Sequence, residues 1–262
     1  MQPFCSIVRG SYGDARPEIT EDLKKELDIL WEICTDDFRL WNKQCSAFTR
    51  FEKFIKAGTL YVDAEFPTIE DKEKILLDEV ILKKLKDNGL ICDCDFRGTR
   101  VSFRYKNDMV HGILTKAGNV LELYSFMILN EIAQENPGYY DDIDIGIFVD
   151  WDGVTHCPYE KVADTQNEID VIVMRDLVPI FISCKNGEAD KSALYELETV
   201  AGKFGGKYAK KAMIASYVSA DKGSKAHIVQ RAKDMGITLI VVEDLPDTSK
   251  AEFKKRLKNM IV

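Results

Sequence analysis

The sequence lacks the features that mark membrane or secreted proteins. No apolar run in its 262 residues approaches the roughly 18–20 residues that span a bilayer. The N-terminal stretch carries four charged residues and no apolar core, so no signal peptide is expected: Arg9, Asp14, Arg16 and Glu18. We therefore expect a cytoplasmic protein that does not engage a membrane.

The cysteines and histidines also form no metal-binding or catalytic motif. The 7 cysteines are irregularly spaced, and Cys92 and Cys94 lie too close together for a usual zinc motif. The 3 histidines begin no metal-ligand or triad pattern. We expect reduced thiols that pack as small apolar side chains, and neither a zinc centre nor a histidine-based active site.

The chain has fewer basic than acidic residues: its 36 Lys and Arg and 44 Asp and Glu give a net charge of −8. A chain of this charge is not expected to coat nucleic acid. Residues 203–233 differ, because basic residues far outnumber the one acid of this stretch, Asp221. Its early lysines are predicted to contact a phosphate backbone: Lys203, Lys207, Lys210 and Lys211. An ordinary solvated helical face is the alternative.

Residues 1–66 predict an irregular segment followed by a helical hairpin. Thr20 and Thr35 each precede acidic residues, as a helix start does, and apolar residues then recur at helical spacing. The hairpin is rich in large aromatic side chains: Trp31, Phe38, Trp41, Phe48, Phe51 and Phe54. We expect these side chains to form a core or a dimer interface rather than to stack on a ligand.

Residues 67–109 predict a winged-helix-like module. A helix is expected from about Thr68 to Asn88, ending at Gly89. Two alternating segments follow around an Arg97-Gly98 turn, which predicts a β-hairpin. The hairpin carries the basic residues Arg97, Arg100, Arg104 and Lys106. A module of this outline nevertheless serves as a connector more often than as a nucleic-acid contact.

Residues 110–262 change to alternating helices and strands. A helix at about 115–134 precedes three successive strands, and helix–strand pairs then complete the chain. This order predicts an α/β fold in which helices flank a central mixed sheet. The initial run of three strands distinguishes it from a purely parallel dinucleotide-binding fold.

Three charged residues in this last region have apolar neighbours. Asp170 lies in one apolar strand, and Lys185 ends the next. Glu122 is the single charged residue between Lys116 and Glu131, on a helix with apolar neighbours. Such groups are costly to bury unless they pair or serve a site, so a structural ion pair is the simplest alternative. Together they offer oxygen ligands for Mg²⁺ or Mn²⁺ and an ammonium, as metal-assisted phosphodiester cleavage requires.

The element order, with Asp170 and the strand end Ser183-Cys184-Lys185, resembles the PD-(D/E)xK nuclease core, a restriction-endonuclease-like fold. Longer segments resemble the C-terminal nuclease half of the CRISPR ancillary effectors that carry a cyclic-oligoadenylate-sensing CARF domain: LTKAGNVLELY, DIDIGIFVDWDG, NEIDVIV, FISCKNG and ALYELETVAGKFGGKYAKKA. The resemblance covers most of residues 20–262. It implies a homodimeric nuclease of type III antiviral defence that uses Mn²⁺ or Mg²⁺. DNA is the implied substrate, cut with little sequence specificity, and RNA is a second candidate.

The chain departs from this family pattern in two ways. Ser183 stands where the superfamily has a carboxylate, so either Glu168 or Glu196 supplies the missing oxygen or metal binding is weak. The stretch before the Trp-rich helices is also too short for a complete CARF domain, and we expect none in this chain. The predicted catalytic residues are Asp170, Lys185, Glu122, Ser183 and Glu196, and the predicted metal ligands are Asp170, Glu122 and Glu168.

Rival functions remain open at this point. The chain could be a non-catalytic nucleic-acid-binding module in which Ser183 marks a decayed site, or a structural dimerisation protein. Within the nuclease class, an enzyme similar to restriction endonucleases or junction resolvases is the runner-up. It would differ by cutting specific sequences or branched substrates.

Overall fold

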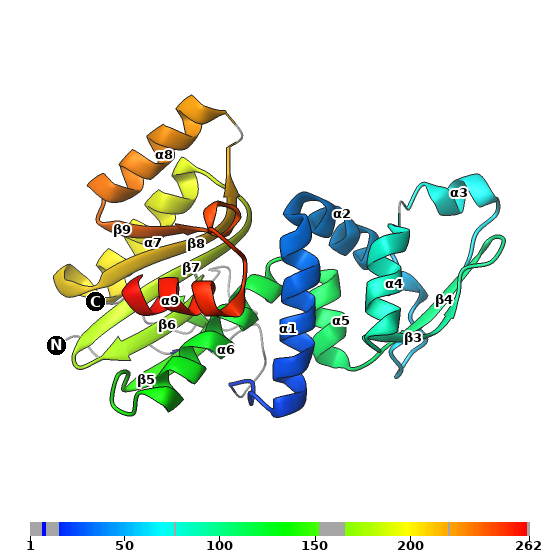
Figure 1. The fold of residues 1–262 in the computed structure, drawn as a ribbon, viewed down its shortest axis with the longest axis horizontal. Helices are drawn as coiled ribbons and strands as arrows, with labels where there is room; N and C mark the ends of the chain where they lie inside the picture. Colours follow the sequence, from blue (N-terminus) through cyan, green and yellow to red (C-terminus); the bar gives the residue numbers. More distant parts are fainter. Residues whose placement is uncertain (1–6, 9–15, 76, 152–165, 220, 261–262) are drawn as a thin grey trace, which may run out of the picture. The chain divides into compact units, whose positions relative to one another are not determined.

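The computed structural model describes residues 7–8, 16–75, 77–151, 166–219 and 221–260. Its contacts divide the chain into two compact units, Glu21–Val120 and Leu121–Val262, the second including the N-terminal residues up to Thr20 (Figure 1). The predicted boundary between residues 66 and 67 therefore falls inside the first of these units.

The helical hairpin predicted in the first unit is present. It consists of α1 (Glu21–Asp36) and α2 (Phe38–Thr49). Asp37 separates them, because its carboxylate accepts hydrogen bonds from the first backbone N–H groups of α2 and thus caps that helix. Trp31 and Trp41 are almost fully buried, so these aromatic side chains form the core of the unit.

The single helix expected over residues 68–88 is wrong, because the structure has two. They are α3 (Ile69–Glu73) and α4 (Glu79–Asp87). Asp78 starts the second helix by accepting a hydrogen bond from the N–H of Ile81 at 2.9 Å. The end of α4 agrees with the prediction, since Gly89 follows it with a φ of +69°, a conformation that favours glycine.

A three-stranded antiparallel sheet completes the first unit together with α5 (Asp108–Thr115), which packs against α2. The predicted hairpin is confirmed as β3 (Ile91–Asp95) and β4 (Arg100–Tyr105), and β2 (Tyr61–Glu65) adds a strand on the other side of β4.

The basic residues of this hairpin are neutralised within the sheet. Each arginine forms an ion pair with a nearby aspartate, at 2.8–3.0 Å: Arg97 with Asp95, Arg100 with Asp63 and Arg104 with Asp93. Exposed ion pairs of this kind contribute little to stability. They nevertheless cancel the positive charge expected of the hairpin from its sequence.

The second unit contains the predicted mixed sheet, in the order β1-β5-β6-β7-β8-β9. Its strands are β1 (Ile7–Val8), β5 (Asp142–Asp150), β6 (Gln166–Arg175), β7 (Val178–Ala189), β8 (Lys210–Val218) and β9 (Ile237–Val241). Strands β5, β6 and β7 run antiparallel, and β7, β8 and β9 run parallel. This is the restriction-endonuclease-like arrangement that the sequence predicts.

Helices cover both faces of this sheet. They are α6 (Asn119–Glu135), α7 (Lys191–Phe204), α8 (Lys222–Asp234) and α9 (Lys250–Met260). Leu194 of α7 and Ile228 of α8 pack with Phe181 of the sheet in one buried cluster. Helices α6 and α9 lie together in front of the sheet in Figure 1. None of the helices in the described ranges combines the length and the apolar run that a membrane crossing requires.

Helices α6 and α9 are joined by a partly buried ion-pair cluster. Glu131, whose side chain is 16% exposed, lies 2.8 Å from the Nζ of Lys250 and 3.1 Å from that of Lys254. Burial by itself raises the pKa of Glu131, but hydrogen bonds from these two ammonium groups lower it below its ordinary value. A lowered folded-state pKa stabilises the fold above the unfolded-state pKa, and this stabilisation is lost as the pH falls.

Replacing Glu131 should therefore destabilise the second unit in a pH-dependent manner. Glu131→Gln is expected to reduce the free energy of unfolding by about 1–2 kcal/mol at neutral pH. The deficit should shrink as the pH falls below about 4. Urea unfolding across this pH range measures both effects. Glu135→Gln is the control, because this exposed carboxylate contacts Lys254 at the rim. Equal deficits in the two variants would contradict the account.

Candidate active site

The candidate site lies where two neighbouring strands diverge. Strands β6 and β7 pair from Arg175 opposite Val178 up to Val171 opposite Ile182. Both strands continue beyond this point, where β6 keeps only its pairing with β5 and β7 only its pairing with β8. The end of their pairing opens a fork in the sheet and leaves the next backbone groups of β7 without partners in β6.

Asp170 occupies this fork. Its Oδ2 atom accepts a hydrogen bond of 2.6 Å from the backbone N–H of Cys184 and a second, of 3.2 Å, from the Ser183 hydroxyl. Both bonds are made to Oδ2, so Oδ1 keeps lone pairs for a further ligand. Asp170 is thereby held against β7, and the hydroxyl of Ser183 supports its carboxylate.

The environment makes the charge of Asp170 costly. Burial raises the pKa of this carboxyl, whereas the Cys184 N–H, the positive charge of Lys185 and the Ser183 hydroxyl act in the opposite direction. Burial has the larger effect, so the pKa is raised overall. A cation next to this carboxylate would stabilise its charged form.

A hollow of about 200 Å³ brings five of the predicted site residues together. They come from three elements: Glu168 and Asp170 of β6, Ser183 and Lys185 of β7, and Glu196 of α7. The Nζ of Lys185 lies 3.9 Å from Oε2 of Glu196. Apolar side chains of Phe181, Leu197 and Val200 close the hollow. The arrangement combines carboxylate oxygens and one ammonium against an apolar wall.

The local sequence of α7 explains why Glu196 reaches this hollow. Asp190 caps the helix by accepting a hydrogen bond from the N–H of Ala193 at 2.9 Å. Leu194 and Leu197 are buried against the sheet, which fixes the rotation of the helix about its axis. Glu196 is therefore carried to the edge of the hollow, where it remains exposed.

Glu122 is not among the residues that line the hollow. Its negative charge acts on the Cys184 thiol, whose Sγ lies 4.0 Å from the hydroxyl of Ser125 on α6. Side chains alternate along a strand, so Cys184 points away from the side that carries Ser183 and Lys185. Glu122 thus approaches β7 from the side of α6.

The same surroundings keep Cys184 protonated. Burial raises the pKa of this thiol well above its ordinary value, and the negative charges of Asp170 and Glu122 raise it further. A thiol of this kind is a poor nucleophile at neutral pH. Its contribution to the site is the backbone N–H that binds Asp170.

The predicted metal ligands Asp170, Glu122 and Glu168 do not assemble into a closed cage. Within the described ranges, no group of three or more His, Cys, Asp or Glu side chains is placed to hold a metal ion. The donors of the hollow are nevertheless hard carboxylate oxygens, the type that Mg²⁺ and Mn²⁺ prefer. Mg²⁺ usually binds through one or two carboxylates and completes its coordination with water and substrate phosphate, so this donor set fits such an ion.

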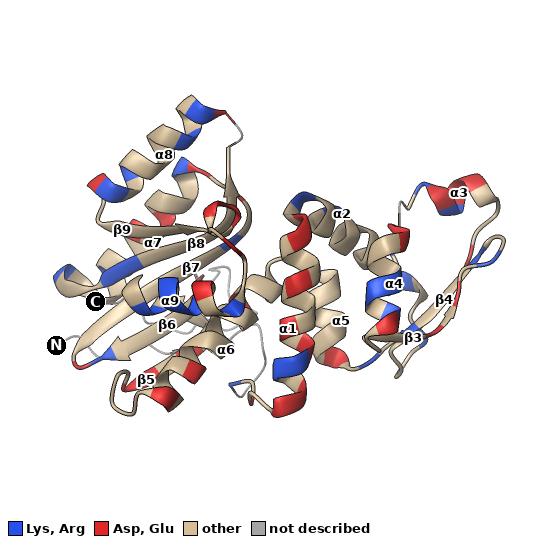
Figure 2. Ribbon diagram, viewed as in Figure 1, with Lys and Arg blue, Asp and Glu red and all other residues tan. Residues whose placement is uncertain are grey.

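The four lysines predicted to bind phosphate differ in their surroundings. Lys203, Lys207 and Lys210 are exposed, and Figure 2 shows positive charge at the start of β8 and along α8. Lys211 is not exposed to a phosphate backbone, because its side chain is only 16% exposed. Its Nζ lies 2.5 Å from Glu198 and 2.7 Å from the carbonyl of Met235. Lys211 therefore links α7 and α8 instead of facing solvent.

Aromatic side chains accompany two of the exposed lysines, Lys203 and Lys207. Trp151 at the end of β5 packs edge-on against Phe204, with ring centroids 5.6 Å apart. The Nζ of Lys203 lies 5.6 Å from the Trp151 ring, and that of Lys207 lies 5.2 Å from the ring of Tyr208. The contacts of Trp151 join segments far apart in the sequence, whereas Lys207 and Tyr208 are adjacent. Aromatic residues at the ends of a strand and a helix are the sequence signal that could have indicated the pair of Trp151 and Phe204.

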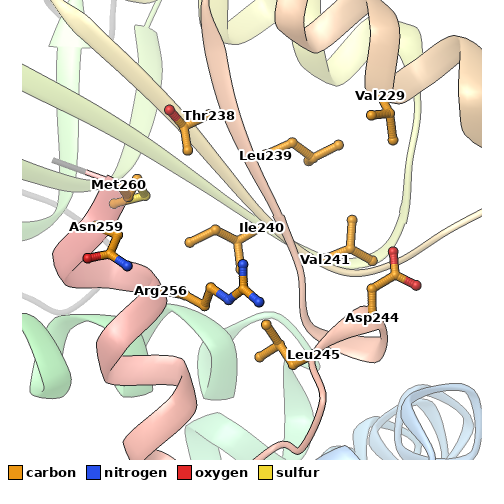
Figure 3. A pocket seen from close by; sticks show the side chains of 10 residues that line it. All are labelled: Val229, Thr238, Leu239, Ile240, Val241, Asp244, Leu245, Arg256, Asn259 and Met260. Atoms are coloured by element: carbon orange, nitrogen blue, oxygen red, sulfur yellow. The ribbon is translucent and has the colours of Figure 1, made fainter. Parts of the chain in front are cut away.

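A second hollow, of about 360 Å³, lies along strand β9 (Figure 3). Its two charged side chains are paired with neighbours, since Arg256 pairs with Glu252 at 2.8 Å and Asp244 pairs with Lys225. It does not combine a cluster of carboxylates with a lysine. The fork between β6 and β7 is therefore the candidate active site.

Comparisons with known proteins assign a family to the part of the chain that contains the fork. The family model described as "Card1-like, endonuclease domain" matches residues 110–260, more than half of the chain and the part that contains the fork. Comparison with curated proteins gave no match.

Two solved structures share the fold. Protein VC1899 from Vibrio cholerae superposes with a TM-score of 0.61 at 17% sequence identity, over 94% of this chain and 56% of that one. Can2 from Sulfobacillus thermosulfidooxidans, solved in complex with cyclic tetra-adenylate, gives 0.58 at 14% identity, over 94% and 58%. The chain thus spans a little over half the length of each protein.

The surroundings of Lys211 predict a structural rather than a binding role. Lys211→Ala is expected to reduce the free energy of unfolding by about 1–2 kcal/mol, because it leaves Glu198 and the Met235 carbonyl without their donor. Lys207→Ala, at an exposed position, should change it by less than about 0.5 kcal/mol. Urea unfolding of both variants measures the difference. Equal stability of the two variants would refute this assignment.

Proposed function

Because the chain belongs to the Card1-like endonuclease domain family, we propose that it is a metal-dependent nuclease that hydrolyses phosphodiester bonds in DNA. RNA is the second substrate to be tested, and little sequence specificity is expected. The observation that carries the proposal is the hollow at the fork, where Asp170, Lys185 and Glu196 meet. The resemblance of the sequence to CRISPR ancillary effectors supports a role in antiviral defence.

Asp170 and Glu168 are the residues that would hold a divalent cation. A bound Mg²⁺ or Mn²⁺ supplies Lewis acidity, which polarises the phosphate and makes water a better nucleophile. The Cys184 N–H and the Ser183 hydroxyl orient the Asp170 carboxylate for this task. Glu122, on the α6 side of β7, would contribute negative charge to the centre from a greater distance.

Lys185 has the complementary role. Hydrolysis adds water across one P–O bond, and negative charge grows on the phosphate oxygens and on the leaving oxygen as this bond breaks. The ammonium of Lys185 would stabilise that charge or orient the attacking water. Glu196, 3.9 Å away, would keep the ammonium at the edge of the hollow. The apolar wall formed by Phe181 and its neighbours would limit competing water.

The exposed lysines at the junction of α7 and β8 would supply attraction for the backbone of the substrate. Lys203, Lys207 and Lys210 lie on the segment that leads from α7 into β8. Their contacts would be to phosphate, so binding should be insensitive to sequence and weaken as salt rises. A local attraction of this kind overcomes the net charge of −8.

The first unit is proposed to contain a winged-helix module, which extends from residues 67–109 to include α2 and β2. The order of its elements supports this: α2, β2, α3, α4, β3 and β4, with the sheet order β2-β4-β3. The arginines of its hairpin are all engaged with aspartates, which favours a connecting role over nucleic-acid contact. A homodimer and activation by a cyclic oligoadenylate are further proposals. The second takes its support from Can2, which was solved with cyclic tetra-adenylate.

One observation favours a second candidate function. Ser183 offers no charge to a metal, and no cage of three carboxylates forms among the described residues. A nucleic-acid-binding module with a decayed nuclease site would have these properties. Titration with Mn²⁺ separates the two, because a binder gives salt-dependent affinity without cleavage, with or without the ion.

Substitutions at the fork test the catalytic assignment. Asp170→Asn and Lys185→Ala are each expected to reduce the rate of Mn²⁺-dependent cleavage of supercoiled or single-stranded DNA by at least about 100-fold. Glu188→Gln and Lys191→Ala remove comparable charges at exposed positions close by and should retain most of the activity. Circular dichroism confirms that each variant is folded. Full activity of the Asp170 variant would overturn the proposal.

A carboxylate at position 183 tests the account of the metal ligands. Ser183→Glu should tighten Mn²⁺ binding in the absence of substrate by about tenfold, because it adds a charged oxygen donor. Ser183→Gln is the matched control, since it has the same size without the charge. Electron paramagnetic resonance of Mn²⁺ measures the free ion directly. Equal affinities of the two variants would show that the ion does not bind at this position.

A further inference from the structure

The loop between α7 and β8 packs against Phe181, a residue that lines the catalytic hollow. Gly205 begins this loop, and a Cβ atom at this position would lie 2.5 Å from the ring of Phe181 and 2.5 Å from Cβ of Ala209. Glycine therefore allows the loop to press against Phe181, which itself lines the hollow. The position of the loop is fixed by this close approach.

An aromatic side chain projects from this loop. Tyr208, at the end of the short helix η2 (Gly206–Tyr208), is 73% exposed. The ammonium of Lys207 lies 5.2 Å from the centre of the Tyr208 ring. Lys203, at the end of the helix that precedes the loop, lies over the ring of Trp151. The loop thus presents an aromatic ring together with positive charge, and these are the two features that bind single-stranded nucleic acid.

The strand register gives the separation between this ring and the catalytic residues. Lys210 lies opposite Ile180, and Met213 lies opposite Ser183. These three residues of β8 correspond to roughly 10 Å along the strand, and Tyr208 precedes Lys210 by two residues. Stacked nucleotides are spaced about 3.4 Å apart along one strand. Tyr208 is therefore about three or more nucleotides from the reacting phosphate.

We propose that Tyr208 and Lys207 form a nucleotide-binding subsite, in which the Tyr208 ring stacks on an unpaired base and Lys207 contacts the adjacent phosphate. The proposal rests on the proposed nuclease function and names the substrate feature that this site recognises. A base within a duplex is stacked on both faces and cannot offer one to Tyr208. The subsite therefore favours substrates with at least about three unpaired nucleotides next to the cleaved bond.

Equilibrium binding without divalent ions tests the subsite, because no cleavage occurs under these conditions. Tyr208→Ala should weaken the binding of a fluorescent single strand of roughly twelve nucleotides by about fivefold. Tyr208→Phe keeps the ring and should bind within about twofold of the unchanged protein. A blunt duplex of the same sequence, and a strand of about two nucleotides, should bind the alanine variant and the unchanged protein equally.

Tyr195→Ala is the matched control. This tyrosine is also exposed, on α7, but Arg231 of α8 both lies over its ring and donates a hydrogen bond to its hydroxyl, which holds it against α8. Its removal should leave the affinity for the single strand unchanged. In the presence of Mn²⁺, Tyr208→Ala should raise KM for the long strand and leave kcat nearly unchanged, as expected for a residue that binds without touching the reacting atoms.

Two results would overturn the subsite. One is equal affinity of Tyr208→Ala and the unchanged protein for the long single strand, and the other is an equal loss for strand and duplex. Neither result affects the catalytic assignment, which depends on the Asp170 and Lys185 variants. Conversely, if those variants cleave normally, the nuclease centre is misplaced whatever Tyr208 binds.

Discussion

The hydrogen bond from the backbone N–H of Cys184 to the carboxylate of Asp170 is the interaction on which the candidate site depends. The strands β6 and β7 separate just before it, which leaves the N–H without a partner in β6. Asp170 supplies the acceptor at 2.6 Å, and the N–H in turn compensates a carboxylate that burial makes costly. The N–H thus gains a hydrogen-bond acceptor, and the buried carboxylate gains a donor that stabilises its charge.

The same bond sets the positions of the neighbouring side chains. Because residues alternate along β7, fixing Cys184 at the fork places Ser183 and Lys185 together on the side of α7. There they meet Glu196, and the Cys184 thiol is turned toward α6. The hollow that results holds more negative than positive charge: Glu168, Asp170 and Glu196 against Lys185. A bound cation would therefore favour a polyanionic substrate in the hollow, and the exposed lysines at the junction of α7 and β8 would add attraction.

Much of this site could be predicted from the sequence, because strand alternation is a local property. An acid in one apolar strand and a lysine at the end of the next already indicated that Asp170 and Lys185 would be neighbours. The family match confirms the resemblance to the nuclease half of CRISPR ancillary effectors. The mixed sheet of the second unit is confirmed as well.

The features that the sequence did not indicate depend on contacts between distant residues. Strand β2 pairs with β4 across the intervening helices, and nothing in its own five residues specifies that partner. Lys211 lies in a basic run, but Glu198 and the carbonyl of Met235 bind it. Glu122 has the apolar neighbours of a site residue, yet it acts on Cys184 from the side of α6. In each case, tertiary packing decides the role of a residue whose local pattern allows several.

The location of the metal is the central claim, and crystals of the protein grown with a non-hydrolysable oligonucleotide and Mn²⁺ test it most directly. Anomalous scattering identifies the ion without reference to activity. The account predicts a Mn²⁺ peak at the fork, within about 2.5 Å of a carboxylate oxygen of Asp170 and of a substrate phosphate oxygen. A peak elsewhere, or an oligonucleotide bound at the fork without any ion, would contradict it.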